Sequence, residues 1–443
     1  MSSGDVLNGM IQSYMAETDA INANTFVDFA QRMKNGETPT IGEKKTLYAR
    51  GSGDCSDVVL LEDNKVFIAY ADVTSDYYIN CAICTIEDDQ VVVKTSGVTL
   101  ASGSNVNTWP DGIVACALTP NLVVVAYSYN ESSEYAYAIA CKIDGNNITV
   151  GSAKSMSSTQ YTGVGMSIDR IDDTKALLIY SGASAIYGAV LSVSGTTITK
   201  GTQKTIQSVS NCARSAVKRM DTNKLIVCYD VSDGYYSYNT YAIAATISST
   251  TVTVGSPVDL GLGRLYDVTA IDASKACVLY GSLKASILTI SGTTITIANT
   301  QNDFSLCPDS TATSPLALRI VYFDDKKLLY MCYLQSIKVN DATIRNYYIL
   351  MCSFNDNNVI TKAYEGLVLS DSEVAGSRNA NMIMLDNDRV LLTLGYTGSE
   401  YLTKFVAYNG TIEDVVRIST GKIDGITKTE CTADAPGEVW VLN

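Results

Sequence analysis

The sequence predicts an all-β fold: a seven-bladed β-propeller with four antiparallel strands per blade, and a small terminal β-rich attachment module. The first observation behind this prediction is a hairpin motif that recurs seven times at intervals of about 50 to 60 residues, the repeat length of four-stranded blades. The second is that the apolar runs flanking the motif have the length of strands and carry no helical periodicity. We therefore expect the propeller to span residues 48–420.

Each copy of the motif consists of an apolar residue, a short polar turn that usually ends in a basic residue, and an apolar run that ends in tyrosine. The seven terminal tyrosines are Tyr70, Tyr127, Tyr180, Tyr229, Tyr280, Tyr333 and Tyr396. Asp, Asn, Thr and Ser suit the turn because their side chains hydrogen-bond the local backbone. A continuous apolar run such as Leu225–Tyr229 is typical of a strand covered on both faces. The motif is thus expected to join the first and second strands of a blade.

A third and a fourth strand follow in each repeat. The nearly identical segments 194–197 and 291–294, both SGTT, place a glycine in the tight turn between them. The residues after this turn alternate apolar and polar, as is typical of a half-exposed outer strand. The seven repeats fall at residues 57–100, 113–155, 164–206, 213–260, 267–300, 316–362 and 380–418. A closed ring would leave no long unpaired sheet edge, whereas the alternative, an open β array, would leave two.

The two ends of the chain differ from the repeats. Residues 1–47 are expected to form a helix and strand attachment segment, because apolar residues recur at helical spacing near the start and residues 25–29 have a strand pattern. The residues at helical spacing are Val6, Leu7, Met10, Ile11, Tyr14 and Met15. The C-terminal segment 421–443 ends in a strand that we expect to pair with the N-terminal segment. The alternative is that one terminal strand only completes the last blade, because residues 39–47 resemble a fourth strand.

Composition excludes several classes of function. The net charge of −14 disfavours nucleic acid as a partner, and no apolar run reaches the roughly 18 residues of a membrane span. The N-terminus also lacks the basic and apolar regions of a secretory signal. Twelve cysteines are spread along the chain, and eight of them lie in apolar runs, which favours reduced thiols that pack as small hydrophobes. The close pair Cys81 and Cys84 has no second pair at zinc-binding spacing.

The sequence carries no recognisable catalytic or cofactor motif. It has no histidine, which removes Ser-His-Asp and Cys-His arrangements, and it has no glycine-rich nucleotide-binding loop. Acidic clusters such as Asp172-Asp173 recur at the same place in each repeat, which indicates turn chemistry instead of a metal site. We therefore expect that the chain is not an enzyme and uses no cofactor or metal. A glycan-degrading enzyme, which needs only two spaced carboxylates, is the alternative.

The repeated Asp-x-x-Lys hairpins with SGTT-like turns, together with the terminal segments 22–29, 423–426 and 437–441, resemble propeller proteins of tailed bacteriophages and prophages. The resemblance covers nearly the whole chain and implies a virion structural protein on the tail, the baseplate or the capsid. It also implies synthesis in the host bacterial cytoplasm, release by lysis, several copies per particle and other virion proteins as partners. It brings no catalytic residues with it.

Tyrosine is the more specific functional signal, with 28 tyrosines against 7 phenylalanines. The loops between strands two and three and between blades are long and should emerge on one face, where tyrosine can contact a host-surface glycan or protein. The candidate ligand-binding residues are Tyr77, Tyr78, Trp109, Tyr129, Tyr135, Tyr235, Tyr236, Tyr238 and Tyr347. The opposing interpretation is that β-propensity alone enriches tyrosine. The second functional hypothesis is then a purely structural decoration or connector that packs against other virion subunits.

Overall fold

The computed structural model forms strands and turns throughout the residues that it describes, with no helix among them. These residues are 11–16, 26–33, 40–41, 45–48, 56–62, 64–72, 78–87, 90–102, 112–131, 133–156, 165–234, 237–301, 313–324, 327–339, 342–369, 379–386, 389–395, 401–407, 412–418, 425–427 and 437–441. The chain separates into two compact units. One unit comprises residues 41–349 and 367–407, and the other comprises residues 1–40, 350–366 and 408–443. Because no described helix exists, none is long and apolar enough to cross a membrane.

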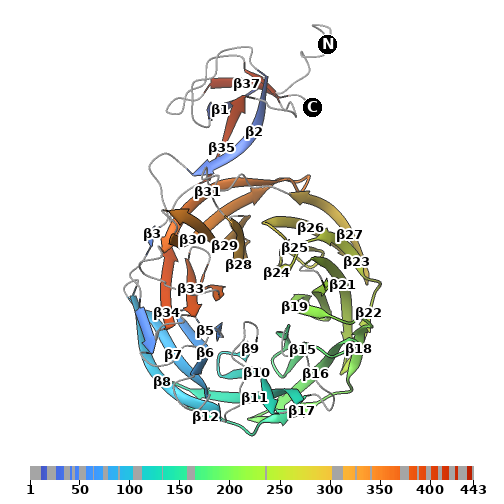
Figure 1. The fold of residues 1–443 in the computed structure, drawn as a ribbon. Helices are drawn as coiled ribbons and strands as arrows, with labels where there is room; N and C mark the ends of the chain where they lie inside the picture. Colours follow the sequence, from blue (N-terminus) through green and yellow to red (C-terminus); the bar gives the residue numbers. More distant parts are fainter. Residues whose placement is uncertain are drawn as a thin grey trace. The chain divides into compact units, whose positions relative to one another are not determined.

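Seven antiparallel sheets form the larger part of the fold (Figure 1). Their first strands are β5 (Ser56–Glu62), β9 (Ile113–Thr119), β14 (Ser167–Asp172), β19 (Cys212–Asp221), β24 (Leu265–Ala270), β28 (Thr313–Phe323) and β32 (Asn379–Met384). The second strands are β6 (Lys65–Asp72), β10 (Leu122–Glu131), β15 (Lys175–Ser181), β20 (Lys224–Ser232), β25 (Lys275–Tyr280), β29 (Leu328–Val339) and β33 (Arg389–Gly395).

The third and outer strands complete each sheet. The third strands are β7 (Tyr78–Glu87), β11 (Ser133–Asp144), β16 (Ile186–Ser194), β21 (Tyr238–Ser248), β26 (Lys284–Ser291), β30 (Ala342–Phe354) and β34 (Tyr401–Ala407). The outer strands of the first six sheets are β8 (Gln90–Ser102), β12 (Asn147–Val150), β17 (Thr197–Lys200), β22 (Thr251–Val254), β27 (Thr294–Gln301) and β31 (Ile360–Leu369). Three short strands, β13 (Lys154–Ser155), β18 (Lys204–Gln207) and β23 (Val258–Leu262), extend the outer positions of the second to fourth sheets.

The first strands of the seven sheets lie next to one another in a closed cycle, from β5 through β9, β14, β19, β24, β28 and β32 back to β5. Apolar side chains fill the space between neighbouring sheets, and the seam between the last and first sheets has the same kind of core. At that seam Leu385 and Leu391 pack with Val58, Ile68 and Tyr70. The expected seven-bladed β-propeller is therefore confirmed, and the open array is excluded.

The repeated motif has the predicted role. Its apolar runs are continuously buried, as in β15, where every residue after Lys175 is buried. The terminal tyrosines for which a side chain is described are at most 4% exposed: Tyr70, Tyr127, Tyr180, Tyr229, Tyr280 and Tyr333. The same holds for the cysteines, since the eight predicted as core hydrophobes are all buried free thiols. These residues are core, because blades cover both faces of each second strand.

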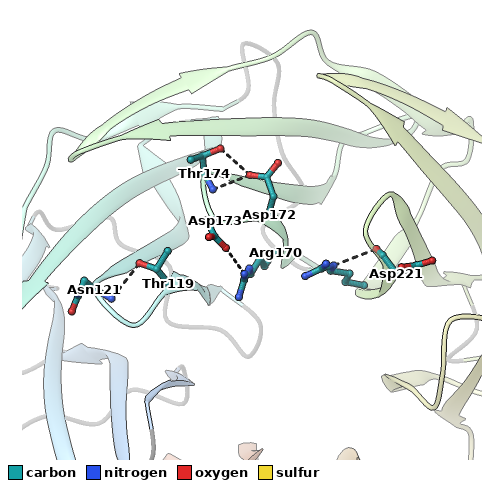
Figure 2. A network of polar contacts seen from close by, with 8 residues as sticks. Thr119, Asn121, Arg170, Asp172, Asp173, Thr174 and Asp221 are labelled. Atoms are coloured by element: carbon teal, nitrogen blue, oxygen red, sulfur yellow. Dashed lines mark hydrogen bonds and ion pairs between the residues drawn. The ribbon is translucent and has the colours of Figure 1, made fainter.

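The polar turns of the motif are held by their own side chains. Asp172 accepts hydrogen bonds from the backbone N–H and the hydroxyl of Thr174, each at 2.8 Å (Figure 2). The hydroxyl of Thr119 accepts a hydrogen bond from the N–H of Asn121 in the preceding blade (Figure 2). Asp272 repeats the pattern of Asp172 two blades later. The acidic residues of these turns therefore serve the local backbone, as the sequence indicates.

The outer position of the seventh blade is filled from the N-terminal side of the chain. The strands β3 (Thr40–Ile41) and β4 (Lys45–Tyr48) both pair with β34. In β4, Tyr48 lies opposite Tyr401 and Lys45 lies opposite Thr403. This corrects the expected seventh repeat at 380–418, in which residues after 407 would have supplied the outer strand. A strand at 45–48 already occupies that edge of β34, so the following segment pairs elsewhere.

The terminal unit contains a closed five-stranded barrel in the order β1, β35, β2, β36, β37. Its strands are β1 (Ile11–Ala16), β2 (Phe26–Met33), β35 (Ile412–Ile418), β36 (Gly425–Thr427) and β37 (Gly437–Val441). Both ends of the chain thus contribute strands. The expected N-terminal helix is wrong over residues 11–16, which pair antiparallel with β37 and parallel with β35. Over so short a segment, pairing with the C-terminal strands overrides the local apolar spacing.

Candidate functional site

Four of the predicted tyrosines stand at the same end of their blades. Tyr78 lies opposite Asp72, Tyr129 lies opposite Tyr135, and Tyr238 lies opposite Ser232. Each of these pairs is at or near the loop that joins a second to a third strand. Equivalent loops of a propeller emerge on one side of the ring together with the connections between blades. We call this side the loop face.

The remaining predicted residues divide into two groups. Tyr77, Trp109, Tyr235 and Tyr236 lie outside the described residues. Tyr347 lies in β30 and is only 1% exposed. The prediction that Tyr347 binds a ligand is therefore wrong. The third strand is a central strand of its sheet, and neighbouring blades cover the Tyr347 side chain from solvent.

Part of the tyrosine excess has a structural cause. The tyrosine that ends the motif stacks on a tyrosine of the third strand in at least three blades. Two examples are Tyr127 on Tyr137 at 5.7 Å and Tyr229 on Tyr241 at 5.3 Å between ring centroids. Each of these pairs is directly opposite in strand register. Cross-strand aromatic pairs of this kind stabilise a sheet. A structural role in the sheets therefore explains the tyrosines at these positions without a role in ligand binding.

A cluster of arginine, tyrosine and leucine lies on the loop face at the fourth and fifth blades. The guanidinium of Arg264 stands 5.1 Å from the ring centre of Tyr238, and that of Arg214 stands 5.5 Å from the ring centre of Tyr266. Leu262, two residues before Arg264 in the chain, is the most exposed large hydrophobic residue described, at 64%. We call Arg214, Tyr238, Leu262, Arg264 and Tyr266 the Arg–Tyr patch.

The backbone holds Leu262 outward. Gly261 and Gly263 on either side have φ values of +100° and +146°, which residues other than glycine rarely adopt. The N–H of Gly263 donates to the carbonyl of Tyr238 at 2.8 Å, and the Lys284 ammonium donates to the carbonyl of Leu262 at 3.0 Å. The leucine is thus presented on a fixed backbone beside a further cation.

A buried carboxylate anchors the Arg–Tyr patch from below. Asp230 is fully buried and accepts hydrogen bonds from the N–H of Arg214 at 2.7 Å and of Leu265 at 3.0 Å. Burial raises the pKa of Asp230 to about 6, although the guanidinium of Arg214 and that of Arg264 oppose the rise. Because Leu265 begins the fifth blade, this one side chain joins two blades under the patch.

The second candidate site is the centre of the ring. A cavity of about 520 Å³ is lined by the first strands of all seven blades. Polar side chains enter it at two equivalent positions of the repeat. Four residues before the apolar residue of each motif stand Asp57, Val114, Ser167, Ala216, Asp267, Arg319 and Asn381. Two residues before it stand Val59, Cys116, Asp169, Lys218, Thr269, Val321 and Ile383.

Three aspartates link neighbouring blades around this cavity. Asp57 accepts from the N–H of Ala115 at 2.7 Å, and Asp267 accepts from the N–H of Ile320 at 3.0 Å. The carboxylate of Asp169 accepts from the N–H of Arg219 at 2.6 Å. Each donor belongs to the next blade. A first strand has no pairing partner on its inner edge, so these carboxylates satisfy N–H groups that would otherwise face the cavity unpaired.

An arginine and an asparagine continue the chain of contacts across the seam. The Nε of Arg319 donates to the Oδ1 of Asn381 at 2.8 Å. The Nδ2 of Asn381 donates to the carbonyl of Ser56, which joins the seventh blade to the first. In the third and fourth blades the hydroxyls of Ser167 and Ser215 lie 3.2 Å apart.

Burial changes the acid–base behaviour of the cavity. It raises the pKa of Asp57 to about 6, against the lowering effects of the Ala115 hydrogen bond and of Arg319. It also raises the pKa of Asp267, with Arg319 again opposing. The carboxylate of Asp169 raises the pKa of Lys218, and this outweighs the effect of burial. Lys218 is therefore a persistent cation at the centre of the propeller.

Lys218 differs from the other charged residues of the cavity in its contacts. Its Nζ approaches Asp169 Oδ2 at 3.9 Å, too far for a hydrogen bond, and its side chain keeps 46% of its accessible surface because it reaches into open volume. The central cavity was not predicted from the sequence. A charged residue inside an otherwise apolar first strand, as at Asp57, Asp169 and Asp267, was the signal that could have shown it.

Known proteins share the fold of this chain. No protein-family model matches it, and no curated protein matches it in sequence. A "putative 6-phosphogluconolactonase" from Bacteroides uniformis is similar with a TM-score of 0.50 and 11% identity, over 80% of this chain and 100% of that chain. A protein of the same description from Bacteroides fragilis has a TM-score of 0.48 and 11% identity, over 80% and 98%. The Dos1 propeller has a TM-score of 0.46 and 8% identity, over 84% and 96%.

The expectation that the chain is not an enzyme is corrected, because a structure with a similar fold is described as a putative 6-phosphogluconolactonase. The expectation relied on the absence of histidine and of nucleotide-binding motifs. Carboxylate and lysine chemistry needs neither, and the central cavity holds both kinds of group in Asp57 and Lys218. At such low identity the likeness shows the fold alone, and this fold serves binding proteins and enzymes alike.

Proposed function

We propose that this chain is a recognition protein of a larger assembly, whose propeller binds a partner through its loop face. The Arg–Tyr patch is the observation that carries the proposal. Arginine and tyrosine dominate the binding energy of many interfaces, and Leu262, 64% exposed and held by the two glycines beside it, adds an apolar contact. Tyr78, Tyr129 and Tyr135 stand at the loop end of the first and second blades, on the same face.

The charge of the patch favours an anionic partner. The chain as a whole carries a net charge of −14, yet the patch holds Arg214 and Arg264, and Lys284 donates to the Leu262 carbonyl. A cationic group on an acidic protein attracts a negatively charged surface locally while the rest of the molecule repels it. Anionic glycans and acidic protein segments of a bacterial surface have this character, and tyrosine rings can pack against sugar faces.

We further propose that the assembly is a bacteriophage particle, with the terminal barrel as the attachment part. The support is the sequence resemblance of the hairpin repeats and of both terminal segments. The barrel is built from both ends of the chain, and its five strands pair with none of the propeller sheets. Mass spectrometry of purified particles from lysates tests the assignment, and absence of the chain from every particle would contradict it.

The binding role is tested on the purified full-length chain. An array of bacterial surface polysaccharides and whole bacterial cells are probed with the wild type and with Arg264→Ala and Leu262→Ser. We expect each substitution to weaken binding at least tenfold, whereas Lys204→Ala, an exposed lysine in β18 of the third blade, leaves it unchanged. Equal binding by all four proteins would exclude the patch as the contact surface.

The second candidate is a purely structural decoration or connector within the particle. The stacked pairs Tyr127–Tyr137 and Tyr229–Tyr241 favour it, because they give the tyrosine enrichment a use inside the blades. In that case the chain binds neither glycans nor cells but co-purifies with a capsid or tail protein. The same array and particle analysis therefore separate the two roles.

A further inference from the structure

The central cavity has the dimensions of a small-molecule site. Its volume of about 520 Å³ lies within the range of roughly 300 to 1,000 Å³ that is usual for ligand pockets. It is lined by first strands from every blade, and each of these strands also contacts the first strands of both neighbouring blades. A site on such walls is preorganised, which reduces the entropic cost of binding.

The chemistry of the lining is mixed. Asp57, Asp169 and Asp267 offer acceptor oxygens, and each carboxylate has capacity for more hydrogen bonds than the backbone bonds described above. Lys218 offers three donor hydrogens, and Ser167 and Thr269 offer hydroxyls that can both donate and accept. These donors and acceptors come from four strands around one volume, namely β5, β14, β19 and β24.

The decisive observation is the ammonium group of Lys218. No hydrogen bond is made by its Nζ to any described residue, and its nearest carboxylate oxygen is 3.9 Å away. A lysine that points into a cavity at the centre of a protein, without a hydrogen-bonding protein partner, leaves three donors for a molecule within the cavity.

The net charge of the lining selects the class of molecule. The three aspartates are opposed by Lys218 and Arg319, so the wall has no large excess of either sign. A polyanion would meet the carboxylates, and a polycation would meet the two bases. Hydroxyl groups suit both, because each donates to a carboxylate and accepts from an ammonium.

We propose that the central cavity binds one small uncharged polyhydroxylated molecule, of the size of a mono- or disaccharide, with Lys218 and the three aspartates as its hydrogen-bonding partners. Lys218 donates to ligand hydroxyl oxygens. The aspartates accept from ligand hydroxyls with the lone pairs that their inter-blade hydrogen bonds leave. This site shares Tyr266 with the Arg–Tyr patch but involves none of the other four patch residues, and it does not depend on the proposed function.

The test uses Lys218→Met in the full-length chain, because no described hydrogen bond is lost with this ammonium and the fold should persist. Glucose, galactose, N-acetylglucosamine and lactose are titrated by saturation-transfer NMR and calorimetry, with glucose 6-phosphate and gluconate as anionic counterparts. We expect at least one neutral sugar to bind the wild type, and to bind Lys218→Met at least tenfold more weakly. Lys204→Met, on the exposed strand β18, is the matched control and should bind like the wild type.

Three results would overturn the proposal. The first is that no neutral sugar of the panel binds the wild type. The second is that only the anionic compounds bind, which would assign the cavity to a different class of ligand. The third is equal binding by wild type and Lys218→Met, which would place the sugar elsewhere. Circular dichroism and the melting temperature establish that each variant is folded, and Lys218→Arg, which keeps the charge, should recover part of the affinity if Lys218→Met loses it.

Discussion

The carboxylate of Asp57, in the first blade, accepts a hydrogen bond of 2.7 Å from the backbone N–H of Ala115, in the second blade. The other oxygen of the same carboxylate accepts from the N–H of Val58 in its own strand at 2.9 Å. One side chain therefore satisfies the inner edges of two strands. The same arrangement at Asp267 joins the fifth blade to the sixth. Polar contacts around the cavity thus supplement the apolar contacts between blades.

The first prediction concerns the dependence of stability on pH. Burial raises the pKa of Asp57 from 3.8 to about 6, so between these values the folded protein holds a proton that the unfolded chain has lost. The free energy of unfolding therefore falls as pH rises through this window, by up to roughly 3 kcal/mol for this group. Urea unfolding of wild type and Asp57→Asn at pH 4, 5, 6 and 7 measures the effect.

Asp57→Asn cannot titrate, so its stability relative to the wild type should improve steadily from pH 4 to pH 7. Replacing Glu62, an exposed residue of the same strand, with glutamine is the control and should leave the wild-type slope unchanged in this range. A constant difference between Asp57→Asn and wild type at all four pH values would show that burial does not shift this carboxyl.

The second prediction concerns the turns between third and fourth strands. Ser249 has a φ of +57°, at the place where the equivalent turns have Gly195 and Gly292 with φ values of +59°. A side chain in this left-handed region is strained, so Ser249→Gly should stabilise the fold by about 0.5 to 1 kcal/mol. Thermal unfolding should show a higher melting temperature. Ser248→Gly, one residue earlier in a strand, is the control and should lower it.

The third prediction concerns the packing of blades at their outer rim. A Cβ added to Gly255, between β22 and β23 of the fourth blade, would lie 2.0 Å from the carbonyl oxygen of Thr293 in the fifth. Because the contact is with backbone, Gly255→Ala should destabilise the protein by about 1 to 3 kcal/mol, measured by urea unfolding. Ser256→Ala at the adjacent exposed position should have little effect. Equal stability of both variants would mean that the two blades can separate without cost.

The fourth prediction concerns the cysteines. Nine are buried free thiols, and burial raises the pKa of Cys84, Cys141 and Cys332 to about 12. Since the thiolate is the reactive form, iodoacetamide should leave all nine unmodified in the folded protein and modify them in urea. Mass spectrometry of each cysteine-containing peptide gives the extent of labelling. Rapid labelling of any of the nine under native conditions would show that its blade opens locally.

The fold could be predicted because the same strand–turn–strand motif occurs seven times in the sequence. The motif ending at Tyr70 is weak evidence, but its recurrence through Tyr333 at nearly constant spacing leaves few architectures open. The buried second strands and the turns at Asp172 and Gly195 follow from local sequence alone. The strand at residues 11–16 could not be predicted from local sequence, since its partners come from the other end of the chain.

The sites were harder to predict because they depend on which residues the ring brings together. Asp57 and Ala115 are far apart in sequence, and only the packing of the first blade against the second brings their strands side by side. Tyrosine composition pointed to the loop face, yet it could not separate Tyr238, beside Arg264, from Tyr347, which the neighbouring blades cover. Lys218 gave no signal, since a lysine in a strand is ordinarily at the surface.

The pairing of β4 with β34 has a consequence for how the protein is made. The segment 45–48 leaves the ribosome before any blade, but its partner at Tyr401 is among the last parts to appear. Throughout translation the incomplete propeller therefore has uncovered blades at both of its ends, and the strand at residues 45–48 has no pairing partner. A chain that ends before Tyr401 could not complete the seventh blade. Its exposed strand edges and apolar blade surfaces would favour association with other nascent chains.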